Sequence, residues 1–568
     1  MKKLVCLLIL GITLTACGCG EGKGEVTQES GIETNENAAS SSAAAFAVSE
    51  RSWEEKALIT LGSTVTIDGT GAEVRENVIV ISEGGSYEVT GTMSDGLLYV
   101  ETDDAVRLYL NNASITSSTG PAIYVENAEE VWIETAEGTE NVLTDAATYQ
   151  GVFAEKNVDT DSEDEVGKGT FFSNDDLIFT GNGLLIVNGN YRHGICSDDS
   201  IYFQGGSYEL AAVKDGVHAN DAIVVNQGDI EVTEGHDGME SEGIITMNGG
   251  SYTASVADDG MSAAGNLTIN DGVITVAACE EGLESKAELY VNGGTITITG
   301  NDDGLNGGTL VQINDGIVCI NMQAGDGLDS NGRLEINGGI ILALGGNAPE
   351  GGADCDENTF IITGGTLIAT GGVNSAPTED KCTQAAVLLG SAAAGDTIGI
   401  RDAQGNTVFA YEVTKSYENL LLSGEFLKEG ESYTVYTGGT ISGTENTYGY
   451  DAQAEYEGGA ESISFTVDSM LISAGGTAGM QGGRGGRFPG GMQDGQFPGG
   501  MDGQMPEGME DGRMPKGMEN GRFPGGGRDG QFRKGMDGQM PEGMEDGQFP
   551  GGSMNGQNVP LQVQVDQK

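Results

Sequence analysis

Apolar residues in the middle of the chain alternate with polar ones in short segments, and each segment returns about every 22 residues. Around Asn248, for example, the apolar positions are Ile245, Met247, Tyr252 and Ala254. Alternation with a period of two is typical of β-strands that bury one face. Each repeat therefore predicts two strands, and an apolar residue two positions after a recurring acidic-Gly pair predicts a short third one.

The acidic-Gly pairs keep this period through six repeats. They are Asp215-Gly216, Asp237-Gly238, Asp259-Gly260, Glu281-Gly282, Asp303-Gly304 and Asp326-Gly327. A fixed short period with glycine punctuation and no helical pattern is typical of a solenoid whose unit is one turn of β-structure. We therefore predict an all-β parallel β-helix of about 22 residues per coil, in which residues one period apart stack.

A column of asparagines keeps the same period: Asn226, Asn248, Asn270, Asn292, Asn314 and Asn337, each followed closely by glycine. Asn and Gly both tolerate positive φ and suit a tight bend. Stacked amides can also hydrogen-bond to one another along the axis. We expect Tyr208 and Tyr252 to point into the core.

The chain divides by composition. Residues 1–16 resemble a lipoprotein signal peptide, since Leu14-Thr15-Ala16-Cys17 resembles a lipobox, so we expect a lipid on Cys17, a membrane anchor and an extracytoplasmic, cell-surface location. A plain cleaved signal peptide is the alternative. Residues 17–50 are small and polar and predict a flexible tether.

The β-helix is expected over residues 51–372, with irregular coils to about residue 174 and regular coils after it. Residues 373–473 lose the period and predict an irregular, antiparallel C-terminal cap over the open end. Residues 474–568 are rich in Gly, Met and Pro without apolar periodicity, which predicts disorder. A disulfide between Cys355 and Cys382 would suit an oxidising compartment.

The formal net charge of −61 changes the range of partners. It argues against nucleic acid, which needs a basic patch. The acidic-Gly pairs would place carboxylates about 4.8 Å apart along one edge. At about 5 Å, two such charges repel by about 3 kcal/mol at an effective dielectric near 20. The stack must raise its pKa values, stay hydrated or bind a cation.

Carboxylate oxygens at flexible spacing favour calcium as the cofactor. The alternative is that Asp-Gly is simply a good turn pair with solvated side chains. If calcium binds, the candidate ligands form two groups and an extension: Asp237, Glu240, Glu242, Asp258 and Asp259; Glu280, Glu281, Glu284, Asp302 and Asp303; then Asp326 and Asp329.

The lipobox, the segment Gly120–Val125, an acidic loop at 159–165 and the Asp-Gly coils together resemble the clostridial carbohydrate-binding β-helix family. The resemblance covers about residues 55–440. It implies a right-handed, calcium-bearing β-helix, similar to pectate-type polysaccharide lyases, that binds plant-cell-wall polysaccharide, either acidic and pectin-like or cellulosic. Arg192, Lys214 and His236 depart from it where the family carries acids. We expect a monomer.

Two other functions remain open. A calcium-dependent pectate lyase would need a base for the C5 proton beside the cation, and the candidates are Arg192, Lys214, His218 and His236. A structural surface adhesin or spacer would use calcium only for stiffness. The sparse exposed aromatics favour calcium-mediated recognition of acidic or mixed glycans.

Overall fold

The structure is a computed structural model that describes residues 51–151, 153, 167–443 and 449–476. The expected signal peptide, Cys17 and tether, the acidic loop at 159–165, and the tail from residue 477 lie outside this range. Within it, no helix has the length and apolar character needed to cross a bilayer.

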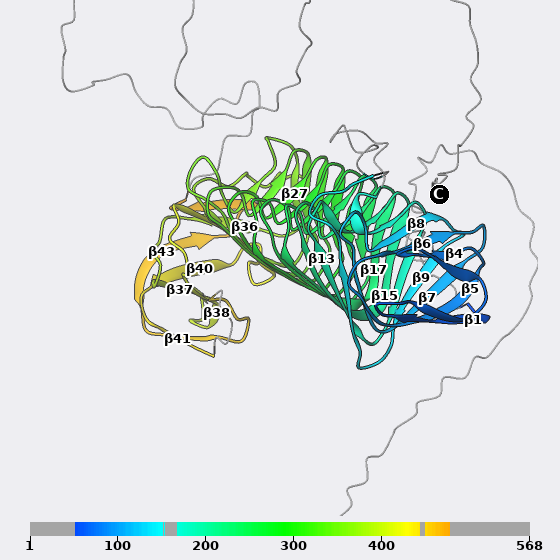
Figure 1. Ribbon diagram of the computed structural model, residues 1–568. Helices are drawn as coiled ribbons and strands as arrows, with labels where there is room; N and C mark the ends of the chain where they lie inside the picture. The colour runs from blue at the N-terminus through cyan, green and yellow to red at the C-terminus, as the bar shows by residue number, and fades with distance from the viewer. Residues whose placement is uncertain (1–50, 152, 154–166, 444–448, 477–568) are drawn as a thin grey trace, which may run out of the picture. The chain divides into compact units, whose positions relative to one another are not determined.

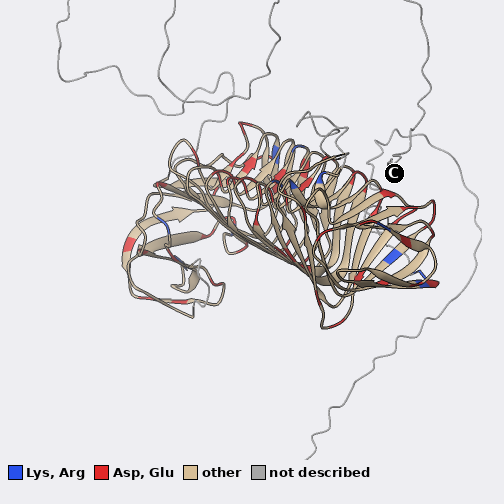
Figure 2. Cartoon of the chain, viewed as in Figure 1, with Lys and Arg blue, Asp and Glu red and all other residues tan. Residues whose placement is uncertain are grey.

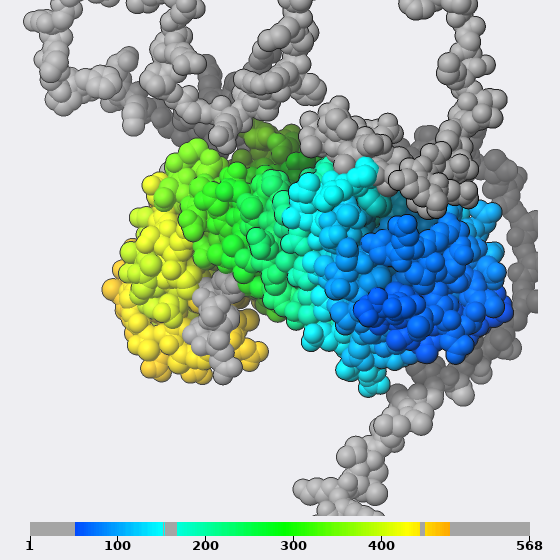
Figure 3. All heavy atoms as spheres, viewed as in Figure 1, coloured from blue at the N-terminus to red at the C-terminus, as the bar shows by residue number. Residues whose placement is uncertain are grey.

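The described chain winds as a β-solenoid with parallel strands, which confirms the predicted fold class (Figure 1). A regular coil contributes three strands in order, as in β18 (Met239–Ser241), β19 (Ile244–Met247) and β20 (Ser251–Ser255). The first joins a 13-stranded sheet, and the other two lie in separate rows of a 25-stranded sheet. Along the solenoid the coils follow the order of the sequence (Figure 3).

The strands of the 13-stranded sheet are β3 (Ala72–Arg75), β4 (Val78–Ile81), β6 (Leu97–Glu101), β8 (Ile123–Asn127), β11 (Gly169–Ser173), β14 (His193–Ser197), β16 (Val217–Ala219), β18 (Met239–Ser241), β21 (Met261–Ala263), β24 (Leu283–Ser285), β27 (Leu305–Gly307), β30 (Leu328–Ser330) and β33 (Ala353–Asp354).

The large sheet begins with β1 (Glu55–Leu61) and β2 (Thr66–Gly69), which pair antiparallel. Four long strands reach across both of its rows: β5 (Gly85–Met93), β7 (Val106–Thr116), β15 (Ser200–Ala212) and β17 (Ala222–Glu234). One row contains β9 (Val131–Thr135), β12 (Leu177–Gly181), β19 (Ile244–Met247), β22 (Leu267–Ile269), β25 (Glu288–Val291), β28 (Leu310–Ile313), β31 (Arg333–Ile336) and β34 (Phe360–Ile362). The other contains β10 (Glu140–Thr144), β13 (Leu184–Gly189), β20 (Ser251–Ser255), β23 (Val273–Ala278), β26 (Thr295–Gly300), β29 (Ile317–Met322), β32 (Ile340–Leu344) and β35 (Thr366–Gly371).

The strand register reproduces the sequence period. Ile245 pairs with Leu267, and Tyr252 pairs with Ile274, each 22 residues on. The apolar positions form one continuous core, in which Tyr208 and Tyr252 are buried as expected. Burying a side chain of this size stabilises a fold by about 1.5–3 kcal/mol, so the stacked columns supply most of the cohesion.

Asparagine amides form a ladder at the bend before the third strand. Each side chain donates to the amide oxygen one coil earlier, from Asn248 to Asn226 at 2.7 Å and onward to Asn337 and Asn314 at 2.9 Å. The positive φ of this bend belongs to the glycine that follows, as at Gly250 (φ 78°), while the asparagines keep negative φ. Asparagine therefore serves here by hydrogen bonding and glycine by conformation.

At the acidic corners, glycine is required for a different reason than at the asparagine bend. A Cβ on Gly260 would lie 2.4 Å from the carbonyl oxygen of Gly282 in the next coil, closer than any side chain can approach. The corner glycine is therefore required by the close stacking of backbones rather than by positive φ.

The C-terminal strands pair mostly antiparallel, as predicted, and β44 (Leu471–Ala474) pairs parallel with β36 (Ala386–Leu389). β39 (Asn419–Ser423) pairs antiparallel with both β35 and β36, so the last coil does not end in a free edge. Lys415 strengthens this junction by donating to the carbonyl oxygens of Leu344 at 3.3 Å and Gly345 at 2.7 Å. The remaining strands are β37 (Thr397–Asp402), β38 (Thr407–Glu412), β40 (Ser432–Thr437), β41 (Thr440–Ser442), β42 (Glu455–Glu457) and β43 (Ala460–Thr466).

The disulfide that Cys355 and Cys382 could form is not present in this structure, because both are free and buried. Each thiol has its own backbone neighbour. The Cys355 Sγ lies 3.6 Å from the carbonyl oxygen of Asn358, and the Cys382 Sγ lies 3.7 Å from that of Phe360. Cys279 and Cys319 are also free.

Candidate functional site: the acidic edge

The acidic corners stack along the start of the strands in the 13-stranded sheet. Backbone hydrogen bonds hold the column together: the amide of Gly216 donates to the carbonyl of Asp237 at 3.0 Å, and that of Gly238 donates to Asp259 at 2.9 Å. We call the acidic edge the corner carboxylates and those of the adjoining strands from Asp237 to Asp354. Figure 2 shows charged residues gathered along the row that includes β27.

Two neighbouring columns run beside the corner acids. In one, backbone bonds join Lys214, His236 and Asp258, with the Asp258 amide donating to the His236 carbonyl at 2.8 Å. In the other, strand pairing aligns the third residues after the acids: Cys196, His218, Glu240, Ser262, Glu284, Asn306 and Asp329. Ionisable residues far apart in sequence therefore meet in small clusters.

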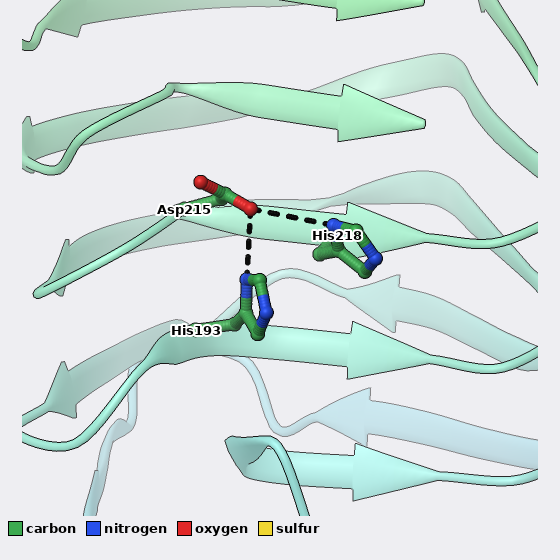
Figure 4. Close-up of side chains that lie close together, drawn as sticks. All are labelled: His193, Asp215 and His218. Carbon is green, nitrogen blue, oxygen red and sulfur yellow. Dashed lines mark ion pairs between the residues drawn. The ribbon is translucent and has the colours of Figure 1, made fainter. Parts of the chain in front are cut away.

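The first of these, the charge-paired cluster, comprises His193, Lys214, Asp215, His218 and Glu240. Asp215 is fully buried, and its Oδ2 lies 2.9 Å from His193 Nδ1, 3.3 Å from His218 Nδ1 and 3.4 Å from Lys214 Nζ. Figure 4 shows both imidazoles directed at this one oxygen. Glu240 Oε2 lies 3.1 Å from both Lys214 Nζ and His218 Nδ1. Positive and negative groups are balanced here within one coil spacing.

This pairing decides the protonation states. Burial opposes the charge of Asp215, but the two histidines outweigh it and hold its pKa well below the usual range. Burial lowers the pKa of His193 to about 3. For His218 and Lys214 burial acts the same way, yet Asp215 and Glu240 prevail and both pKa values are raised. A raised pKa keeps the proton on Lys214 and His218 and disfavours them as general bases.

Next along the edge, a cluster joins Asp237, Asp258 and Asp259, with one ligand atom of each within 4.8 Å of the others. The half-exposed His236 adjoins it, with Nδ1 3.2 Å from Asp237 Oδ1 and Nε2 3.5 Å from Asp258 Oδ2. Asp237 also has a structural task, since its Oδ1 accepts the backbone N–H of Asp259 at 2.9 Å.

Farther on, the clusters become almost wholly acidic. Asp259, Glu281 and Glu284 place carboxylate oxygens within 4.8 Å of one another. Lys286 pairs with Glu284 from an exposed position, and Asn306 donates to Glu281 at 3.0 Å. One ammonium therefore faces three carboxylates.

The last cluster joins Asp326, Asp329 and Asp354, again within 4.8 Å. Asp326 accepts the backbone N–H of Gly351 at 2.5 Å, and the Ser375 hydroxyl donates to Asp354. No lysine, arginine or histidine forms an ion pair with these three acids among the residues the structure describes.

Crowding and burial raise the pKa values of these acids. Burial is the larger cause throughout, followed by repulsion from neighbouring carboxylates at Asp259, Glu281 and Asp329. The pKa of Asp329 rises to about 8, and that of Asp303 to about 6. Such acids either keep protons at neutral pH or exchange them for a cation. Grouped carboxylate oxygens suit a hard cation such as Ca²⁺.

Several candidate ligands lie apart from these clusters. Glu240 belongs to the charge-paired cluster instead, and Glu242 is exposed. Glu280 and Asp302 are also exposed, with Asn301 donating to Glu280 at 2.8 Å. Asp303 uses its Oδ1 to accept the Asp326 backbone N–H at 2.7 Å.

The sequence interpretation missed four participants. His193 and Asp215 stand in the corner column, and their alignment over two coils was the signal that could have found them. Asp354 comes after a longer coil and so falls outside the regular period. Lys286 had no columnar signal. Of the candidate lyase residues, Lys214 and His218 share the charge-paired cluster, while His236 lies nearer Asp237 and Asp258.

A polar groove lies at the asparagine bend, away from the acidic corners. Its volume is about 410 Å³, and its lining includes Asn182, Gln204, Gln227 and Asp229 beside bend glycines. The Nε2 of Gln204 is buried, and no residue in the described part of the chain forms a hydrogen bond with it. Amides of this kind can bind hydroxyl groups.

The chain is similar to two known proteins. A protein from Acetivibrio thermocellus described as carbohydrate-binding domain-containing is 34% identical over 145 residues. The match covers 25% of this chain and 48% of that protein, so the chain spans about half the length of the relative it matches. A solved structure of a polysaccharide lyase-like protein from C. thermocellum, a gadolinium derivative, is 28% identical with a TM-score of 0.38, covering 42% of this chain and 96% of that one.

The family model described as carbohydrate-binding domain-containing protein matches residues 75–281 and 276–442. These matches take in the solenoid coils, the acidic edge and most of the antiparallel C-terminal strands. The chain belongs to this carbohydrate-binding domain family.

Proposed function

We propose that this protein is a lipid-anchored surface protein that binds plant-cell-wall polysaccharide through calcium ions held on its acidic edge. Membership of a carbohydrate-binding family supports the ligand class. The anchor rests on the lipobox at Cys17. The observation that carries the calcium is the pair of almost wholly acidic clusters, Asp259–Glu281–Glu284 and Asp326–Asp329–Asp354.

Charge favours an acidic glycan as the ligand. A chain of net charge −61 repels a polyuronate. A calcium ion coordinated by both an edge carboxylate and a uronate would turn that repulsion into attraction, because the glycan would complete the coordination of the ion. A cellulosic ligand has no charge to bridge, and hydroxyl groups would suit the groove near Gln204 and Gln227.

The test measures binding of the full-length protein to polygalacturonate and to cello-oligosaccharides, each in calcium and in EGTA. We expect polygalacturonate binding only in calcium, and its loss in a Glu281→Gln, Asp329→Asn double variant. The matched control is Glu242→Gln, an exposed acid outside the clusters. Binding that survives EGTA and the double variant but falls in Gln227→Ala would place recognition in the groove and overturn the calcium proposal.

The same samples separate the two other functions. Unsaturated uronide appearing with polygalacturonate, measured by ultraviolet absorbance, would identify a lyase. Stabilisation by calcium with no affinity for any glycan would identify a structural spacer. The raised pKa values of Lys214 and His218 lead us to expect binding without turnover.

A further inference from the structure

The charge-paired cluster contains an arrangement that ion pairing alone leaves incomplete. Asp215 has no exposed surface, and neither of its carboxylate oxygens makes a hydrogen bond of acceptable geometry within the described structure. His193 Nδ1 is also buried and lies 2.9 Å from Asp215 Oδ2, but it too lacks such a bond. Buried polar atoms are normally hydrogen-bonded, so the contacts of 2.9 and 3.3 Å to the histidines leave the hydrogen-bonding capacity of these atoms unfilled.

The three ligand atoms meet the distance requirement of a small transition-metal ion. His193 Nδ1, Asp215 Oδ2 and His218 Nδ1 lie within 4.8 Å of one another, with Asp215 2.9 and 3.3 Å from the two nitrogens. Bonds of about 2.0–2.1 Å in a tetrahedron put neighbouring ligand atoms about 3.3 Å apart. A zinc ion could therefore bind with small side-chain rotations.

The donor set also differs from the rest of the edge. Two imidazole nitrogens and one carboxylate favour Zn²⁺ and its transition-metal neighbours, whereas calcium takes oxygen ligands. Three protein ligands leave coordination positions for water or another ligand. Lys214, whose ammonium lies 3.4 Å from Asp215 Oδ2, is 38% exposed and can turn toward Glu240 when a metal arrives.

We propose that His193, Asp215 and His218 form a binding site for a divalent transition-metal ion, separate from the calcium sites of the acidic edge. The site rests on strands β14 and β16, whose register fixes it: Cys196 pairs with His218, which brings His193 level with Asp215. The proposal does not depend on glycan binding.

The first experiment titrates the metal-stripped, full-length protein with Zn²⁺ in excess Ca²⁺ by calorimetry. We expect one zinc per chain, with affinity reduced at least about tenfold by His218→Gln. His236→Gln is the matched control, because His236 is exposed and is not one of the three proposed ligands, although a ring nitrogen lies within 4.8 Å of an Asp215 oxygen. No zinc binding near one equivalent, or equal binding by the His218 variant, would overturn the proposal.

A second measurement uses the unmodified chain and so does not depend on whether a variant folds. The chain has three histidines, and labelling them with ¹⁵N gives a spectrum in which the His236→Gln protein identifies the His236 signals. We expect one equivalent of zinc to shift the Nδ1 signals of the other two. Shifts confined to His236, or none at all, would show that the cluster is only an ion-paired core.

Discussion

The two ends of the column of acidic corners share one backbone geometry, but the pKa of the buried acid is shifted in opposite directions. At the charge-paired cluster, two histidines and a lysine surround Asp215, and the pKa of this buried acid is lowered. At the far end, Asp326 sits among Asp329 and Asp354, and its pKa is raised. Burial raises the pKa in both places, so the sign is decided by neighbouring side chains.

The contrast shows how a repeating fold can vary its chemistry coil by coil. The corner backbone bonds are alike from Gly216 to Gly304. The residues beside each corner change, from Lys214 and His218 to Asp258 and Glu284. Where opposite charges lie together, their ion pairs stabilise the fold. Where only carboxylates lie together, a bound cation would relieve their repulsion.

The largest effect should follow from removing Asp215, the central acid of the charge-paired cluster. Asp215→Ala leaves Lys214 and His218 without their buried partner, and breaking such a pair costs about 3–5 kcal/mol. Chemical denaturation in the metal-free state measures the free energy of unfolding. Glu242→Ala, which removes an exposed acid, should change it by less than about 0.5 kcal/mol. Similar losses in the two variants would contradict the comparison.

Calcium should stabilise the protein by binding to the acidic clusters, and the size of this stabilisation should depend on pH. Raised carboxyl pKa values contribute stability that is present below the unfolded pKa and is lost as pH rises through the folded value, about 8 for Asp329. The metal-free fold therefore loses this contribution between about pH 4 and pH 8. Calcium at about 100 times its Kd should restore about 2.7 kcal/mol per site at pH 8.5.

Thermal melting with and without calcium at pH 5 and pH 8.5 checks this. At pH 5 protons compete for the same oxygens, so the calcium shift should nearly vanish. Equal shifts at the two pH values would mean that calcium acts elsewhere.

A smaller change should come from neutralising Asp259 in the cluster that it forms with Glu281 and Glu284. Asp259→Asn removes repulsion with Glu281 and Glu284, so the metal-free protein should become more stable at pH 8.5. Calcium affinity should fall about tenfold, equivalent to about 1.4 kcal/mol. Calorimetric titration measures the affinity, and Asp302→Asn, an exposed neighbour, is the control. A variant that binds calcium like the original chain would remove Asp259 from the site.

The smallest effect should come from Lys286, the lysine beside the cluster of Asp259, Glu281 and Glu284. Lys286 is exposed and pairs with Glu284, and surface pairs of this kind contribute about 0.2–1 kcal/mol. Lys286→Met should therefore raise calcium affinity by about twofold to fivefold. Unchanged or weaker binding would show that Lys286 does not compete with the cation.

Prediction from sequence was strongest where the period is regular. The alternating strands, the Asn248–Asn226 ladder and the stacked corners all follow from residues 22 positions apart. It was weaker at Asp354, which follows an irregular coil. It was also weaker at Cys355 and Cys382, because the sequence does not determine the direction in which the two thiols point.

The sequence by itself determined the coil, because strict alternation and a constant period leave few ways to bury the apolar columns. It also determined which ionisable residues share a column. Only the tertiary structure decided which side chains within and between columns face one another. Glu240 turns to Lys214 and His218 rather than to Asp237, and His193 meets Asp215 in the core, because side-chain direction and burial depend on the neighbouring coil as well as on the residue's own position.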